Sequence, residues 1–261
     1  MPDALLARVS AAAEEAAALA LGCAGKVKRW EKPGGEPVCQ ADLDVDRLLR
    51  HRLGEIDPQA GWLSEESVDD KSRLAAERVW VVDPIDGTRD YLRGRPGWAV
   101  SIALVEDGRP VLGVLAAPAR GECWTALSGE GAWRNGEAIR VLPRDVLEGA
   151  RVPADQLPRR DRDLVPVHKP NSIALRVALV AAGEADLVAT MRWGHEWDIA
   201  AAVLLAEEAG ARVTDALGAP LAFNTESAEA FGLLVSTPGI HGAAVARLAG
   251  YTAVAERLAG R

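Results

Sequence analysis

The feature that most constrains this chain is an apolar run that ends in two carboxylates. Residues 78–82 read Arg-Val-Trp-Val-Val, and residues 83–88 continue as Asp-Pro-Ile-Asp-Gly-Thr. A short apolar run bounded by turn residues is typical of a buried strand. Proline at 84 and glycine at 87 predict a tight turn, which points both carboxylates and the Ile85 carbonyl at one spot. The segment therefore predicts a strand that ends in converging oxygen atoms.

Such oxygen atoms suit a hard cation such as Mg²⁺. Gly87 lets the backbone come close, and N–H groups that open a short helix after it favour an anion. Two other interpretations stay open for segment 83–88 alone. Asp-Pro and Asp-Gly pairs also form plain turns in which Asp86 caps a helix. Aspartyl phosphatases of the haloacid dehalogenase type also run into Gly-Thr, but their carboxylates are two residues apart and those here are three apart.

Composition excludes several other classes of protein. The 261 residues and the 49% hydrophobic content predict a globular protein. The net charge of −8 argues against a basic surface that binds nucleic acid. Its three cysteines show no CxxC spacing, which favours a reducing cytoplasm over a disulfide framework or a zinc site. Residues 4–21 are apolar, but Arg8, Glu14 and Glu15 interrupt them. We therefore expect neither a signal peptide nor a membrane span.

The remaining chain shows two different patterns of predicted secondary structure. Helical spacing predicts helices over residues 4–21 and from Asp42 to about Ile56. Short β-like runs follow, with hairpin turns at 106–110 and 135–136, and they predict an antiparallel meander. Beyond about residue 140 strands and helices alternate, with a loop over 153–163 and a last helix from about Gly239. We expect an N-terminal α+β lobe (1–140) with most metal ligands, packed on a C-terminal α/β lobe (141–261) that carries Asp198 and substrate contacts.

Further carboxylates lie where a metal site needs them. Residues 65–67 (Glu-Glu-Ser) follow a short strand, and Asp198 opens an apolar helix; alone, the first is a solvated loop and the second a helix cap. Together with residues 80–88 and 197–201 (Trp-Asp-Ile-Ala-Ala), in this order, they resemble the inositol monophosphatase superfamily of Mg²⁺-dependent, lithium-sensitive phosphatases. The resemblance covers nearly the whole chain, because 38–42 looks like the family's Val-Thr-Ala-x-Asp segment and 172–187 like its later helix and strand. It implies an αβαβα layered sandwich, a mixed α+β and α/β fold.

The resemblance also implies the metal ligands. Glu65, Asp83 and the Ile85 carbonyl look like the ligands of a first Mg²⁺. Asp83, Asp86 and Asp198 look like the ligands of a second, with Asp83 bridging. A third, weaker ion would lie near Glu65 through water, so we expect two or three Mg²⁺ ions.

The same resemblance implies the catalytic groups. Thr88 paired with Asp42 resembles the dyad that holds an attacking water, and the amides of Gly87 and Thr88 would hold the phosphate. The resemblance also implies that Glu65 is a catalytic residue, together with Asp42 and Thr88. Two cations about 3.5–4 Å apart neutralise a phosphate monoester dianion, lower the pKa of a bound water and stabilise the leaving alkoxide, so no covalent intermediate is required.

Departures from the family bear on the substrate. Inositol phosphatases tend to carry a Glu seven residues before the Trp-Asp aspartate, where this chain has Met191. Residues 89–91 (Arg-Asp-Tyr) are closer to the Lys-Glu-Phe of 3′(2′),5′-bisphosphate nucleotidases, and Arg176 falls where those enzymes often have Lys. We therefore expect 3′-phosphoadenosine 5′-phosphate or a similar bisphosphate. Inositol-1-phosphate and other sugar or histidinol phosphates are the alternative, and a non-catalytic protein that binds a phosphorylated metabolite is a remote one.

Other residues carry weaker expectations. Ser172, Arg176 and His195 resemble substrate contacts, although Arg176 also reads as a solvated helix charge and His195 as a packed ring. The family's Thr is Cys39 here, which changes the surroundings of Asp42. The charged run 159–163 reads as a solvated loop. We expect a small phosphorylated metabolite as the partner, with no nucleic acid polymer and no membrane, and a homodimer because family members are often dimers.

Overall fold

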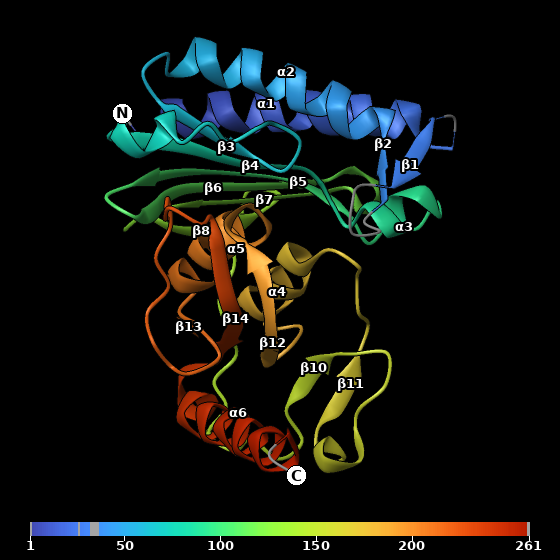
Figure 1. The fold of residues 1–261 in the computed structure, drawn as a ribbon, viewed down its shortest axis with the longest axis vertical. Coiled ribbons are helices and arrows are strands. Elements are labelled where there is room, and N and C mark those ends of the chain that lie inside the picture. The colour runs from blue at the N-terminus through green and yellow to red at the C-terminus, as the bar shows by residue number, and fades with distance from the viewer. Residues whose placement is uncertain (1, 26, 32–36, 260–261) are drawn as a thin grey trace.

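The structure is a computed structural model that describes residues 2–25, 27–31 and 37–259. Its elements stack as helix, sheet, helix, sheet and helix, so the expected αβαβα sandwich is confirmed (Figure 1). The helices of these layers are α1 (Pro2–Cys23), α2 (Gln40–Ile56), α4 (Ile173–Ala181), α5 (Glu196–Glu208) and α6 (Pro238–Ala259). Within the described ranges, none of the helices has the length and apolar character to span a bilayer.

The larger sheet has seven strands in the order β3-β4-β5-β6-β7-β8-β9. β3 runs parallel to β4, and each later pair is antiparallel, which confirms the predicted meander. Its two-residue hairpin turns, 107–108 and 135–136, have positive φ throughout, as type I′ turns require. The strands are β3 (Gly61–Ser64), β4 (Arg78–Asp86), β5 (Ala99–Glu106), β6 (Arg109–Ala117), β7 (Glu122–Leu127), β8 (Gly131–Arg134) and β9 (Glu137–Ala138).

The smaller sheet lies on the other side of α4 and α5 (Figure 1). It has the antiparallel order β12-β14-β13. Two separate strand pairs complete the sheets: β1 with β2, antiparallel, and β10 with β11, parallel. The remaining elements are β1 (Arg29–Glu31), β2 (Pro37–Cys39), β10 (Arg151–Pro153), β11 (Val165–Val167), β12 (Leu187–His195), β13 (Arg212–Thr214), β14 (Glu229–Ser236), the short helix α3 (Thr88–Leu92) and the 3₁₀ turns η1 (Ser72–Ala75), η2 (Pro118–Arg120) and η3 (Arg159–Asp161).

Both faces of the larger sheet are buried, which explains the continuous apolar run of β4. Trp80 and Val82 join the core beneath α1 and α2, whereas Val79 and Val81 join the core beneath α4 and α5. Alternate residues of a strand point to opposite faces, so a sheet covered on both sides needs apolar residues at every position. A third core lies between the smaller sheet and α6.

Helix α5 packs closely on the sheet because β6 has a glycine beneath it. A Cβ at Gly113 would lie 2.8 Å from the Ala201 carbonyl oxygen. Helix α5 and the sheet strands therefore belong to one hydrophobic core, to which residues on both sides of position 140 contribute. The division into lobes 1–140 and 141–261 stays a prediction.

The charged run 159–163 is not only a solvated loop, as its sequence suggested. Arg247 of α6 donates to Asp163, with Nη2 2.6 Å from Oδ2. The Tyr251 hydroxyl donates to Asp161, and the Arg160 guanidinium lies 3.8 Å from the centre of the Tyr251 ring. The sequence interpretation was incomplete because these charges find their partners about 85 residues further along the chain, on the last helix.

Candidate active site

A pocket of about 190 Å³ lies at the carboxyl end of β4. Most of the site residues expected from sequence meet there, although they come from four separate elements. The lining residues are Pro37, Glu65, Asp83, Ile85, Asp86, Gly87, Thr88, Arg89, Asn171 and Asp198. We call this space the carboxylate pocket.

The motif itself is shaped by a bulged strand. A turn directly after Val82 was predicted, but β4 continues to Asp86, with an irregular register between Asp83 and Asp86. A bulge keeps the strand paired while it redirects side chains, so both carboxylates still reach the pocket. The chain then turns at Gly87, whose φ is +94° and where a Cβ would lie 2.7 Å from the Gly97 carbonyl oxygen. Only glycine fits this position.

Asp83 is a buried acid at the centre of the pocket's charges. Its Oδ1 accepts a hydrogen bond from the Ile85 N–H at 2.9 Å. Burial raises the pKa of Asp83 well above its usual value, and the charges of Glu65, Asp86 and Asp198 raise it further. Several carboxylates therefore repel one another around one point.

Asp86 links β4 to the start of α4. Its Oδ2 accepts hydrogen bonds from the Ser172 hydroxyl and from the Ala174 N–H at 2.8 Å, and its Oδ1 accepts from the Ile173 N–H at 3.3 Å. Burial raises the pKa of Asp86, while these hydrogen bonds and the nearby Arg176 charge oppose the rise. Ser172 is fully buried and also accepts from the Leu175 N–H at 2.9 Å. A direct contact between Ser172 and substrate stays a prediction.

Thr88 and Asp42 are both near Asp83: Thr88 lines the same pocket, and the Asp42 charge acts on the Asp83 carboxyl. The Thr88 hydroxyl donates to the Ile85 carbonyl at 3.1 Å, and Asp42 Oδ2 accepts from the Cys39 N–H at 2.8 Å, as an N-terminal residue of α2. The Asp42 charge also raises the pKa of Asp83, so the two carboxylates are near each other. Burial raises the pKa of the Cys39 thiol to about 12, so it stays neutral beside Asp42. The Thr88–Asp42 dyad remains a prediction.

The carboxylate pocket fits a divalent cation by its chemistry. Within the described ranges, no three His, Cys, Asp or Glu side chains are grouped closely enough to hold a metal ion as they stand. Hydrogen bonds hold two of the carboxylates towards other partners. Asp86 is turned to α4, and Asp198 Oδ2 accepts from the His195 N–H at 3.0 Å. The donors are nonetheless all oxygen atoms, and a hard cation would relieve the repulsion centred on Asp83. The donor set therefore suits a hard divalent cation.

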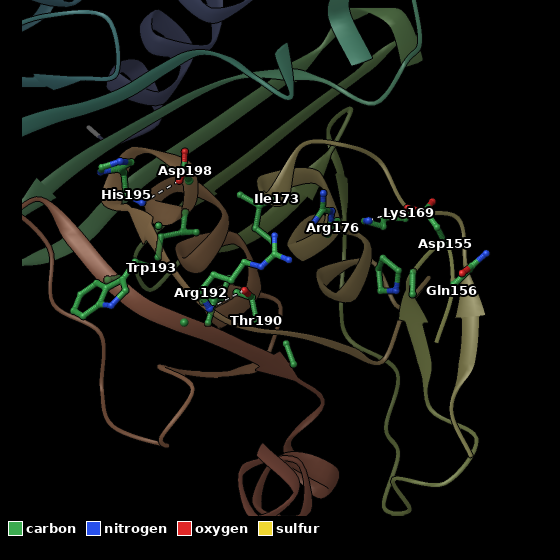
Figure 2. Close-up of a pocket in the computed structure, with 18 residues that line it drawn as sticks. Asp155, Gln156, Lys169, Ile173, Arg176, Thr190, Arg192, Trp193, His195 and Asp198 are labelled. Carbon is green, nitrogen blue, oxygen red and sulfur yellow. Dashed lines mark hydrogen bonds and ion pairs between the residues drawn. The ribbon is translucent and has the colours of Figure 1, made fainter. Parts of the chain in front are cut away.

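A larger cavity of about 640 Å³ adjoins the carboxylate pocket, and Asp198 lines both (Figure 2). We call it the basic cavity because Lys169, Arg176 and Arg192 line it. Arg176 is turned to the backbone, since its guanidinium donates to the Pro170 and Asn171 carbonyls. Lys169 pairs with Asp155 at 2.8 Å. Arg192 extends from β12 towards Ile173 (Figure 2), and no described carboxylate pairs with its guanidinium.

His195 also lines the basic cavity. Its ring stacks on Trp197, with centroids 4.3 Å apart and planes 13° apart. Its buried Nδ1 has no hydrogen-bond partner among the described residues. The ring therefore packs against Trp197 at the edge of the basic cavity.

Sequence reasoning missed Arg192, which lies beside Trp193. Both belong to the second half of β12, where the pairing with β14 shifts register between Thr190 and Trp193. Met191 packs towards the core beneath α6, so its neighbour Arg192 faces the cavity. Trp193 is 67% exposed and lies against Phe231, so it is not a core residue.

Residues 89–91 divide between the site and the core. Arg89 is exposed and lines the carboxylate pocket. Asp90 Oδ2 accepts from the Asn171 N–H at 3.1 Å, and the buried Tyr91 donates its hydroxyl hydrogen to the Ala20 carbonyl at 2.8 Å. Asp90 and Tyr91 therefore hold the site in place from outside.

Comparison with known proteins identifies the family and the fold. A model of the inositol monophosphatase family matches residues 3–253. A Thermotoga maritima protein, fructose-1,6-bisphosphatase/inositol-1-monophosphatase, is 35% identical over 204 residues, which cover 74% of this chain and 78% of the relative. The 3′(2′),5′-bisphosphate nucleotidase CysQ of Shigella flexneri is 32% identical over 201 residues, covering 73% and 80%. The crystal structure of extragenic suppressor protein suhB from Bartonella henselae has a TM-score of 0.80 at 29% identity, covering 94% of this chain and 98% of that one.

The chain therefore belongs to the inositol monophosphatase family. It is a phosphatase that hydrolyses phosphoric monoesters, and its family is generally metal-dependent.

Proposed function

We propose that the chain is a Mg²⁺-dependent phosphatase of bisphosphates, with 3′-phosphoadenosine 5′-phosphate or a similar molecule as substrate. The observation that carries the proposal is the junction of the two cavities at Asp198. A phosphate ester held in the carboxylate pocket would extend its remaining groups into a space lined by basic side chains. Substrates with a second phosphate gain most from such surroundings.

The carboxylate pocket would hold the reacting phosphate. Glu65, Asp83, Asp86, Asp198 and the Ile85 carbonyl are the groups that would hold Mg²⁺. Bound there, the ions supply positive charge for the phosphate and a more acidic water.

The chain's own groups would do the rest. The N–H groups of Gly87 and Thr88, which open α3, would donate to the phosphate oxygens. The Thr88 hydroxyl would turn away from the Ile85 carbonyl and donate a hydrogen bond to Asp42. That bond would leave the hydroxyl oxygen facing the attacking water. These assignments follow the family resemblance residue by residue.

The basic cavity would hold the second phosphate and the base. Arg192 has the geometry for a bidentate contact with a phosphate, and the described carboxylates leave its guanidinium unpaired. The Trp193 ring lies on the side of the cavity away from Arg176 (Figure 2), and its exposed face suits an aromatic base. The 32% identity to CysQ supports the same class of substrate.

A second candidate is a phosphatase of sugar or inositol phosphates. It is favoured by the 35% identity to the Thermotoga maritima protein, whose name includes both fructose-1,6-bisphosphate and inositol-1-phosphate activities. Met191 argues for the first candidate, because its side chain packs towards α6 and offers no acceptor to a ring of hydroxyls.

Phosphate release from a panel of substrates tests the proposal. Purified protein with Mg²⁺ is given 3′-phosphoadenosine 5′-phosphate, inositol-1-phosphate, fructose-1,6-bisphosphate and histidinol phosphate, and kcat/KM is measured for each. We expect the highest value for the nucleotide. A clear preference for inositol-1-phosphate would refute the bisphosphate assignment, and tight binding without phosphate release from any of the four would refute the enzymatic one.

A further inference from the structure

Two buried charges flank the turn at residues 224–225. Glu196, in the first turn of α5, is fully buried, and Arg73 of η1 has only 1% of its surface exposed. They do not pair with each other in a salt bridge; instead, both bind the same short piece of backbone. A buried charge is costly unless hydrogen bonds satisfy it, so the two side chains and the turn depend on one another.

Glu196 holds the donors of the turn. Its Oε2 accepts from the Asn224 N–H at 2.6 Å, and its Oε1 accepts from the Thr225 N–H at 2.9 Å and from the Thr225 hydroxyl. The Glu196 N–H donates to the Ala228 carbonyl at 3.0 Å. The end of the turn is therefore tied to the first residues of α5, two positions from Asp198.

Arg73 holds the acceptors of the same turn. Its Nη1 donates to Asn224 Oδ1 at 2.6 Å, and its Nη2 donates to the Thr225 carbonyl at 2.8 Å. Arg73 also donates to both oxygens of Asp69, at 3.1 and 2.9 Å. Lys71 adds a contact from Nζ to the Glu226 carbonyl at 2.7 Å. The C-terminal part of the loop after β3 is thus hydrogen-bonded to the turn at 224–225.

The near end of that loop is fastened to α2. Asp46 is buried and accepts hydrogen bonds from the Ser64 and Ser67 hydroxyls, the latter at 2.8 Å. Glu65 lies between these two serines. Its loop is therefore held by Asp46 on one side and by Arg73 on the other.

The turn itself has little freedom. Asn224 and Ala228 both have a φ of +56°, in the left-handed region that non-glycine residues rarely adopt. Such backbone persists only where surrounding contacts enforce it. Here the contacts come from Glu196 and Arg73, so movement of the turn would break hydrogen bonds to two buried charges.

We propose that Arg73 and Glu196 are positioning residues, which set the distance between Glu65 and Asp198 across the carboxylate pocket. Neither lines that pocket. They act through the turn at 224–225, which connects the loop of Glu65 to the helix start of Asp198. The inference rests on the proposed metal site, because its consequence is the affinity of that site for a divalent cation.

Direct binding of Mn²⁺ to the substrate-free protein tests the proposal. Mn²⁺ replaces Mg²⁺ as the probe because calorimetry and electron paramagnetic resonance detect its binding without turnover. We expect Arg73→Met and Glu196→Gln each to weaken Mn²⁺ binding about 10-fold or more, as changes to groups that orient metal ligands do. Arg73→Lys restores only part of the affinity, because one ammonium cannot reach both Asn224 and Thr225. The KM for substrate at saturating metal should change little.

Arg151→Met is the matched control. Arg151 forms an equally well-defined pair with the buried Asp186, with Nη2 2.6 Å from Oδ1, and lines neither cavity. Its loss should lower the urea midpoint as Arg73→Met does but leave Mn²⁺ affinity unchanged. If Arg73→Met and Glu196→Gln lose stability as Arg151→Met does but bind Mn²⁺ like wild type, Arg73 and Glu196 are structural only and the proposal is wrong. If wild-type protein binds no Mn²⁺, the proposed metal site fails as well.

Discussion

Ser172, at the start of α4, donates its hydroxyl hydrogen to Asp86 of β4, 86 residues earlier in the chain. The same hydroxyl accepts the Leu175 N–H, so one side chain caps a helix and holds a carboxylate. A hydrogen bond to the charged form of an acid favours ionisation, which opposes the effect of burial on the Asp86 pKa. Ser172 thereby holds Asp86 in place and favours its ionised form.

Ser172→Ala separates this role from a contact with substrate. Loss of the helix cap and of a buried hydrogen bond should cost about 2 kcal/mol of stability. The Asp86 pKa should rise, so a higher Mg²⁺ concentration is needed for half-maximal phosphate release. The KM for substrate at saturating Mg²⁺ should stay the same. A large rise in KM alone would instead support the contact implied by the family resemblance.

Ser101→Ala is the control for that variant. Ser101 of β5 is equally buried and pairs with Asp83 across the sheet, but its hydroxyl has no hydrogen-bond partner among the described residues. Its removal should leave both stability and the Mg²⁺ requirement close to wild type.

Asp83→Asn should have opposite effects on activity and on stability. The pKa of Asp83 is raised by burial and by neighbouring carboxylates, so its ionised form destabilises the metal-free protein at neutral pH. A neutral Asn should raise the melting temperature measured in EDTA. It should also remove the rise in melting temperature that we expect Mg²⁺ to give the wild type, and lower phosphate release by about 100-fold or more. Wild-type phosphate release from this variant would refute the role of Asp83.

The local pattern of the sequence predicted the elements well. The meander, the Asp-Gly and Asn-Gly turns and the helix beginning near Asp42 all follow from periodicity and turn residues, which act over a few positions. The end of β4 was predicted less well: Asp-Pro reads as a turn, but antiparallel pairing with β5 continues through a bulge as far as Asp86. That pairing is a tertiary effect which the sequence of one strand does not contain.

The candidate site was predictable for a different reason. Glu65, Asp83 and Asp198 are spread over the chain, and only their resemblance to a known order of motifs brought them together. Arg73 and Glu196 have no such signal in the sequence. Their role depends on hydrogen bonds to the turn at 224–225, and those contacts form only in the folded chain. Arg192 was missed because a register shift in β12 decides which of its neighbours faces the cavity.

Arg192→Gln tests the second-phosphate site. The loss of a charged hydrogen bond to phosphate should raise the KM for 3′-phosphoadenosine 5′-phosphate by about 10- to 100-fold. Hydrolysis of a monophosphate such as inositol-1-phosphate should be unaffected, because it has no second phosphate to bind. Arg192→Lys keeps the charge but not the bidentate geometry, so it should recover only part of the loss. Equal effects of Arg192→Gln on both substrates would show that Arg192 does not read the second phosphate.

Asp69→Asn provides a pH test of the network around Arg73. Burial alone would raise the pKa of Asp69, but hydrogen bonds from Arg73 and Lys71 outweigh it and lower the pKa to about 2. Because the folded pKa lies below the unfolded value of about 3.9, the ionised carboxylate stabilises the fold at neutral pH, by about 2 kcal/mol. This stability is present above about pH 5 and is lost as the pH falls towards 2.

The measurement is the free energy of unfolding in urea, for wild type and for Asp69→Asn, between pH 7 and pH 3. We expect the variant to be less stable at pH 7 and the difference to shrink steadily as the pH falls. Asp155→Asn is the control, because Asp155 pairs with Lys169 at an exposed position where solvent screens the interaction. A difference for Asp69→Asn that stays constant with pH would mean that packing at this position, rather than the charge held by Arg73, stabilises the loop behind Glu65.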